Sequence, residues 1–267
     1  MQDAASGVDL SGLRVLVLAF AFALPRILGL FAVLPFLSRQ NLPGMLRMGV
    51  AVSMALMVVP SVLPLAMDGD IGTARIAAIV VKEALIGVVL GFLVALLFWA
   101  AEAIGFFIDN QRGATMSSSM NPLTGVSTSP LGILLSQGVT VLFFVSGGFL
   151  LLMGGLYETY ALWPVGSFWP AFRLEQALSF LGQLDHMMYL AIVMSAPVIL
   201  AMFLSELGLA MISRFAPQLQ VFFLAMPIKS AVAMLVLAVY VPFLVEYLGP
   251  ELKEAIALPA RMDHLAR

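Results

Sequence analysis

Six long apolar stretches, separated by short polar segments, dominate the pattern of this 267-residue chain. A helix of about 20 apolar residues is long enough to cross a bilayer, and open strands cannot cross one. We therefore predict an all-α membrane protein with about six long, kinked helices arranged in helical hairpins. The predicted spans run roughly over residues 13–37, 45–67, 76–108, 131–156, 187–213 and 219–248.

Prolines interrupt most of these stretches. Because proline removes a hydrogen bond from the helical ladder, we expect kinks at its positions. The third stretch is the longest and has room to tilt, kink or protrude. Prolines inside the stretches include Pro25, Pro35, Pro60, Pro64, Pro197 and Pro227.

The polar segment Asp109–Pro130, between the third and fourth stretches, is the clearest departure from the apolar pattern. It contains neither Ile nor Phe, has two Gly and two Pro, and is rich in Ser and Thr. Non-helical backbone at membrane depth is tolerated only where protein buries it or water reaches it. The segment is therefore either a solvent loop or the lining of a pathway.

Composition supports the membrane assignment. The chain is 62% apolar and 10% charged, whereas a soluble domain is about 45–50% apolar and 25% charged. The net charge of −2 argues against binding nucleic acid. The absence of cysteine excludes disulfides, thiol catalysis and cysteine-bound metals.

Ionisable residues lie inside or at the rim of the apolar stretches, where they need partners in this chain or in neighbouring chains. One pair follows from counting along the last predicted hairpin. Glu206 and Lys229 lie at nearly equal distances from a turn at Pro217 and Gln218, so they reach the same depth. They either pair with each other or face different neighbours. The other such residues are Arg14, Arg26, Arg47, Lys82, Glu83, Glu102 and Arg214.

The third stretch contains three of these charges, Lys82, Glu83 and Glu102. Lys82 and Glu83 are adjacent, so we expect their side chains to diverge and not to pair. Glu83 and Glu102 are 19 residues apart, and we expect them to share a helix face. A proton relay is conceivable, but a structural role is favoured because no His or Asp continues the series.

The sequence predicts no enzyme, cofactor or metal site. His186 and His264 lack ligand-like spacing. Ser117–Ser119 have no base nearby, and no G-x-S-x-G or phosphate-binding loop occurs. Met116 and Met120 stand out within the polar segment, because flexible thioethers suit either a deformable seal or ordinary packing.

Topology and the flanking segments complete the organisation. Five Lys or Arg fall on one side of a six-span model and four on the other, so no positive-inside bias appears. We interpret the aromatic segment 157–176 as an interfacial loop in preference to a ligand-binding aromatic box. Residues 177–186 are interpreted as a short amphipathic entry to the fifth helix, and 249–267 as a short soluble helix. The expected division is an N-terminal region 1–186, a C-terminal hairpin 187–248 and this tail.

Several motifs together resemble the type III secretion export-gate family. SELGLAMISRFAPQLQVFFLAMPIKS (205–230) is similar to its signature, with Gln220 where the family usually has Asn. FFIDNQRGATMSSSMNPLTGVSTSPLG (106–132) resembles the T subunit of injectisomes more than the related flagellar protein FliR. PFLSRQNLPGMLRMGVAVSMAL (35–56) and KEALIGVVLGF (82–92) fit the same family.

The resemblance implies a pore plug at about Phe107–Gly125, within the wider segment 107–130. Met116 and Met120 would lie near its constriction, and four polar residues would lie at its base. It also implies that Lys229 faces a partner subunit. The implied plug residues are Phe107, Asp109, Asn110, Gln111, Arg112, Met116, Ser118, Met120, Asn121 and Pro122.

The resemblance further implies a pseudo-hexameric spiral assembly with several copies of two smaller hydrophobic subunits. Expected neighbours are the autoproteolytic switch subunit, the needle base and membrane lipid. The assembly would lie in the bacterial inner membrane, raised toward the periplasm, and would admit unfolded secreted proteins. The alternative from another class is a secondary transporter that binds a small solute at an unwound segment. An intramembrane hydrolase would need an acid, base or nucleophile set, which the sequence does not offer.

Overall fold

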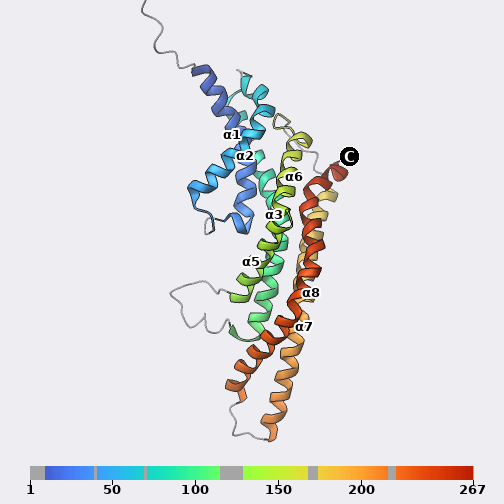
Figure 1. Cartoon of the computed structure of the whole chain (residues 1–267). Coiled ribbons are helices and arrows are strands. Elements are labelled where there is room, and N and C mark those ends of the chain that lie inside the picture. Colours follow the sequence, from blue (N-terminus) through green and yellow to red (C-terminus); the bar gives the residue numbers. More distant parts are fainter. Residues whose placement is uncertain are drawn as a thin grey trace, which may run out of the picture. The chain divides into compact units, whose positions relative to one another are not determined.

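The chain is helical in a computed structural model that describes residues 10–38, 41–68, 71–114, 129–167, 174–215 and 221–266 (Figure 1). No strand occurs in these ranges, so the prediction of an all-α protein is confirmed. The α-helices are α1 (Leu10–Val33), α2 (Gly44–Met67), α3 (Thr73–Gln111), α5 (Pro130–Val145), α6 (Gly148–Leu162), α7 (Leu174–Phe215) and α8 (Val221–Ala266). A 3₁₀ turn, η1 (Pro35–Leu37), follows α1.

Five helices in the described ranges are long and apolar enough to cross a membrane. They are α1, α2, α3, α7 and α8, and they correspond to five of the six predicted spans. Pro35 interrupts the first span as expected, because it begins η1 directly after α1. Pro25 and Pro197, in contrast, lie inside continuous helices.

The predicted fourth span, 131–156, is wrong as a single helix. It divides into α5 and α6, and Gly147 between them has a φ of +76°, which glycine adopts without strain. The N–H of Ser146 closes α5 by donating to the Leu142 carbonyl at 2.9 Å. The bent pair counts as a sixth candidate span only if both helices are taken together.

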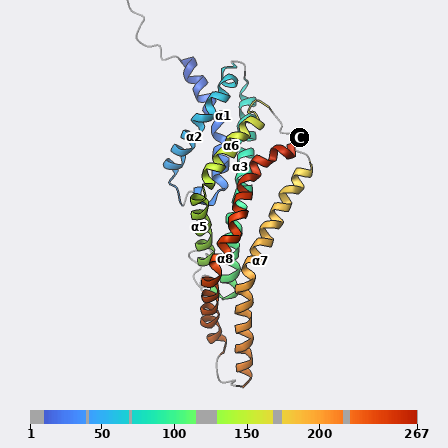
Figure 2. The same cartoon turned by 45° about the vertical axis from the view of Figure 1, so that its right-hand side comes forward.

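The last two helices are longer than expected. Residues 177–186 lead into the fifth span as expected, because α7 runs through them from Leu174 without a break. The tail is helical as predicted, but it continues α8 as far as Ala266. Figure 2 shows α7 and α8 as two long neighbouring helices, as Figure 1 does from another side.

The chain forms two compact units. Unit 1 contains Met1–Ala95, Leu150–Ala177 and Ile256–Arg267, and unit 2 contains Leu96–Phe149 and Leu178–Ala255. In unit 1, α1 packs against α2, and the side chains of Phe22, Ile27 and Phe31 are fully buried.

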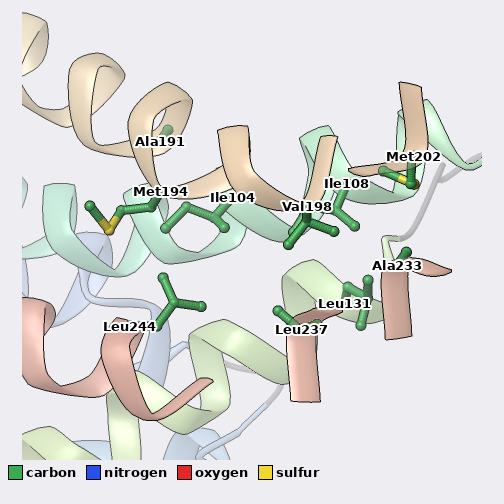
Figure 3. Close-up of a cluster of buried hydrophobic side chains, with 10 residues drawn as sticks. All are labelled: Ile104, Ile108, Leu131, Ala191, Met194, Val198, Met202, Ala233, Leu237 and Leu244. Atoms are coloured by element: carbon green, nitrogen blue, oxygen red, sulfur yellow. The ribbon is translucent and has the colours of Figure 1, made fainter. Parts of the chain in front are cut away.

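The core of unit 2 is an apolar cluster in which α3, α5, α7 and α8 meet (Figure 3). Lipid is as apolar as these side chains, so the cluster is held mainly by close packing. It places the end of α3 and the start of α5 beside the C-terminal hairpin. The labelled residues are Ile104, Ile108, Leu131, Ala191, Met194, Val198, Met202, Ala233, Leu237 and Leu244.

Candidate functional site

One buried carboxylate joins the two flanks of the polar segment. Asp109, in the last turn of α3, is fully buried. Its Oδ2 accepts hydrogen bonds from the Ser129 hydroxyl at 2.7 Å and from the Leu131 N–H at 3.0 Å. Its Oδ1 lies 2.7 Å from both Nε and Nη2 of Arg112. We call Asp109, Arg112, Ser129 and Leu131 the Asp109 clamp.

The clamp also completes the first turn of α5. Ser129 is the N-cap, and its hydroxyl accepts the Gly132 N–H at 2.9 Å. Pro130 follows at the first helical position, where the missing N–H costs nothing. The Leu131 N–H is bound by Asp109, whose negative charge suits a helix N-terminus. A side chain of α3 therefore holds the start of α5.

Beside the clamp, α3 and α5 contact each other through their backbones. A Cβ added to Gly105 would lie 2.2 Å from the Gly132 nitrogen. A Cβ added to Gly132 would lie 2.9 Å from the Glu102 carbonyl oxygen. Both positions therefore require glycine for close approach, and the two helices are held together one turn before Asp109.

The structure describes only the flank of the predicted plug. Phe107 packs against the cluster of Figure 3, and α3 continues as far as Gln111, so residues 107–111 are helical. Asp109 lies in the clamp and Asn110 is exposed. The remaining predicted plug residues lie outside the described ranges: Met116, Ser118, Met120, Asn121 and Pro122.

Ser129 and Leu131 are parts of this site that sequence reasoning missed. A usable signal was present, because Ser129-Pro130 before an apolar run is typical of an N-cap followed by proline at the first helical position. The sequence did not, however, indicate which residue this cap would bind. Asp109 precedes Ser129 by 20 residues, and only the packing of α3 on α5 brings the two together.

Of the two arrangements left open for Glu206 and Lys229, the structure shows the ion pair between them. Lys229 Nζ lies 2.7 Å from Glu206 Oε2. The lysine side chain is 13% exposed and the glutamate side chain 45% exposed, so the carboxylate is the more accessible partner. Arg214 is exposed in the last turn of α7, where a cation suits the helix dipole. The predicted turn residues Pro217, Gln218 and Gln220 lie outside the described ranges.

We expect Glu206→Lys and Lys229→Glu each to lower the amount of folded protein in membranes, because each places two like charges side by side. The double exchange should recover most of the loss by restoring the pair. The measurement is the yield of folded protein extracted from membranes. The control combines Lys229→Glu with Glu246→Lys, which has the same net charge but does not restore the pair. A double exchange no better than this control would contradict the prediction.

A second charged cluster lies inside unit 1. Arg26 of α1 and Glu83 of α3 are fully buried, and Nε and Nη2 of the arginine both lie 2.7 Å from Glu83 Oε2. The guanidinium also donates to Thr159 Oγ1 at 3.1 Å and to the Trp163 carbonyl at 2.9 Å. Its Cζ lies 4.0 Å from the centre of the Tyr160 ring. These contacts join α1, α3 and the C-terminal end of α6.

Lys82 extends this cluster. Its Nζ donates to the carbonyls of Val165 at 2.9 Å and Ser167 at 2.8 Å. It also lies 2.8 Å from Glu83 Oε1, an ionic contact because Oε1 has no well-directed hydrogen bond. The expectation that Lys82 and Glu83 do not pair is therefore wrong, since the flexible lysine side chain bends back. We call Arg26, Lys82 and Glu83 the Arg26 cluster.

Two glycines allow α1 and α3 to approach closely at the Arg26 cluster. A Cβ on Gly87 would lie 2.0 Å from the Arg26 carbonyl oxygen, and one on Gly29 would lie 2.4 Å from the Ala84 carbonyl oxygen. Glu83 precedes Gly87 by one helical turn. The close backbone contact therefore brings the guanidinium within reach of the carboxylate.

The expectation that Glu83 and Glu102 share a helix face is wrong. Glu83 is fully buried between two cations, whereas Glu102 is exposed. Eighteen residues make five turns, so a separation of 19 residues rotates the second side chain by about 100°. The two carboxylates therefore do not form the start of a proton relay.

Among the described residues, no group of three or more His, Cys, Asp or Glu could hold a metal ion. His186 instead lies with Nε2 2.9 Å from Glu251 Oε2, which links α7 to α8. The side chain of His264 is not among those described. The described site works through charge, hydrogen bonds and close packing.

Comparison with known proteins agrees with the resemblance in the motifs. The family model described as "Bacterial export proteins, family 1" matches residues 17–255. The chain is 44% identical over 225 residues to "Yop proteins translocation protein T" of Yersinia pestis, which covers 84% of this chain and 86% of that protein. It is 36% identical over 226 residues to "Surface presentation of antigens protein SpaR" of Salmonella typhimurium, which covers 84% and 83%.

The similarity extends to the flagellar branch. The chain is 30% identical over 224 residues to "Flagellar biosynthetic protein FliR" of Bacillus subtilis, which covers 83% of this chain and 85% of that protein. The identity is lower than the 44% shared with the Yersinia protein. The matched region includes both the Arg26 cluster and the Asp109 clamp.

Proposed function

Because the chain belongs to family 1 of the bacterial export proteins, we propose that it is a pore and gate subunit of a type III protein export apparatus. With partner subunits it forms the entrance pore through which unfolded proteins cross the bacterial inner membrane. The relatives support this role, because their names refer to translocation of Yop proteins and to a secretion system apparatus. The chain itself is a multi-pass membrane protein of the same family.

The Asp109 clamp is the observation that supports a gate. It ties the end of α3 and the start of α5 to one carboxylate, so the segment between them begins and ends at one fixed place. A segment held in this way can close a pathway and move aside without separating the helices that carry it. In this proposal residues 115–128 are the moving part, and Met116 and Met120 contribute to the seal.

The surface of the C-terminal hairpin supports a role in a larger assembly. Each of these helices contains an 18-residue apolar stretch that is long enough to cross a membrane. Only 33% of that stretch in α7 and 17% of it in α8 is buried within the chain. Large apolar side chains on these helices, such as Leu204 and Val239, are therefore free to contact neighbours or lipid. We propose that the neighbours are several copies of two smaller hydrophobic subunits, in a complex raised toward the periplasm.

We expect deletion of Met116–Asn121 to increase leakage through the assembled gate, because the shortened segment no longer fills the pathway. The measurement is release of a small trapped dye from proteoliposomes that contain the purified export complex. A length-matched control replaces the same six residues by alternating Gly and Ser, which separates loss of side chains from loss of length. Normal assembly with unchanged leakage would exclude the plug role.

Purification of the complex distinguishes the gate from the transporter class. A gate subunit should purify with two other hydrophobic subunits at fixed ratios. A protein that purifies alone and binds a small solute would instead support the secondary transporter. The same preparation supplies the material for the leakage measurement.

A further inference from the structure

Glu102 is an exposed carboxylate in the apolar helix α3. It has no ion pair or hydrogen bond to any side chain in the part of the chain that the structure describes. Nine residues separate it from the end of α3 at Gln111, which is roughly 14 Å along the helix axis. Its short side chain cannot span that distance to reach the helix end.

The exposed face of α3 at this level is a narrow stripe. Glu102, Phe106 and Asn110 are exposed at intervals of four residues, so they lie on one helix face. The buried Ile104 and Ile108 lie on the opposite side, in the cluster with α5, α7 and α8 (Figure 3). We call Glu102, Phe106 and Asn110 the Glu102 stripe. It points away from the core of unit 2.

The surroundings of the stripe are mainly apolar. The backbone of Gly132 contacts the Glu102 carbonyl, and the next residues of α5, Ile133 and Leu134, are exposed apolar side chains. Water does not solvate a surface of this kind well, and lipid does not accept an ionised carboxylate. A second helix with a cation at the same depth satisfies both the apolar side chains and the charge.

Among the described residues, a second copy of this chain offers no free cation at the depth of Glu102. Three of its Lys or Arg residues lie well inside the described apolar helices, and each is already paired with a carboxylate. These residues are Arg26, Lys82 and Lys229. The other cations whose side chains the structure describes lie within three residues of the end of a candidate membrane span, and they are Arg14, Arg47, Arg75, Arg112, Arg214 and Lys253. The described cations therefore favour a different polypeptide as the partner.

We propose that the Glu102 stripe is an intersubunit surface that receives a membrane helix of a different export subunit, through a Lys or Arg that pairs with Glu102. This inference rests on the proposed function, since it requires a complex of several subunits. Phe106 packs against the partner's apolar side chains. The ion pair sets the axial position of the partner helix, because a shift along α3 would leave both charges in apolar surroundings.

Cross-linking in the complete complex tests the contact. A photoreactive amino acid at Phe106, on the same face as Glu102, should cross-link to a membrane helix of another subunit that carries Lys or Arg. Cross-linking only to lipid or to this chain would overturn the proposal. Because the chain has no cysteine, Glu102→Cys provides a second readout. Rapid reaction with a hydrophilic thiol reagent in the assembled complex would show a water-lined face and would also overturn it.

Charge exchange tests the pairing. Glu102→Lys should reduce the co-purified partner by about tenfold or more, because like charges in a dry interface are strongly unfavourable. Changing the cross-linked Lys or Arg of the partner to Glu should restore the complex. Asp68→Lys, which changes an exposed carboxylate after α2, is the control and should have little effect. Failure of the exchange to restore the complex would overturn the pairing, whereas failure of the unaltered chain to co-purify any subunit would contradict the proposed function itself.

Discussion

Arg26→Met should destabilise unit 1 by about 3–5 kcal/mol, the usual cost of leaving one partner of a buried ion pair without the other. Glu83 would then keep only Lys82, and the hydrogen bonds to Thr159 and the Trp163 carbonyl would be lost. Methionine fills much of the arginine volume, so the effect reports charge and hydrogen bonding more than a cavity. The measurement is the thermal midpoint of the purified complex together with the yield from membranes.

Three further variants make this prediction specific. Arg26→Lys keeps the charge but lacks the planar fork that reaches several acceptors at once, so it should recover only part of the stability. Arg26→Met combined with Glu83→Met should be less harmful than the sum of the single changes, because no buried carboxylate remains. Arg14→Met, an exposed arginine of the same helix, is the control. Equal effects of the changes at Arg14 and Arg26 would contradict the structural role of the cluster.

Asp109→Ala should release the start of α5 from the end of α3. The substitution removes the acceptor for the Ser129 hydroxyl and the Leu131 N–H, and it leaves Arg112 without its carboxylate. Each buried group left unsatisfied costs about 1–3 kcal/mol. Because the clamp holds both flanks of the polar segment, we expect increased dye leakage through the assembled gate in addition to reduced stability.

Distance measurements separate these two effects. The chain lacks cysteine, so spin labels attached to Phe106→Cys and Ile133→Cys report only on α3 and α5 beside the clamp. The distance distribution should be narrow with Asp109 intact and broader in Asp109→Ala. Asp68→Asn, which alters an exposed carboxylate outside the clamp, should leave both leakage and the distribution unchanged. An unchanged distribution in Asp109→Ala would show that the Gly105–Gly132 contact alone fixes the two helices.

The helices were predictable because their signal is local. In a membrane, any apolar run of sufficient length must form its backbone hydrogen bonds within its own helix, whatever surrounds it. This reasoning located five of the predicted spans, and it failed at Ser146-Gly147, where both neighbouring segments are equally apolar. The continuation of α8 through the tail was missed for a related reason. A polar helix end and a separate polar helix have the same composition.

Pairing of charges was predictable only where geometry was local. Glu206 and Lys229 flank one turn, so counting residues fixed their relative depth. Arg26 and Glu83 are 57 residues apart, and Arg26 and Thr159 are 133 residues apart. Arg26 and Glu83 were recognised as charges in apolar stretches, but many partners were open to each, and Thr159 was not singled out. The expected separation of Lys82 and Glu83 failed because a long flexible side chain is not confined to its own helix face.

The sequence by itself determined the helical class, the membrane setting, the position of the polar segment and the family. These follow from hydropathy and from motifs that lie within short windows of the chain. The tertiary structure decided which charges are neutralised, and it identified Asp109 as the residue that binds the Ser129 cap and the Leu131 N–H and so joins the two flanks of the polar segment. The physical reason is that a buried charge is stabilised by whichever groups packing brings within about 3 Å, and packing depends on all the helices together.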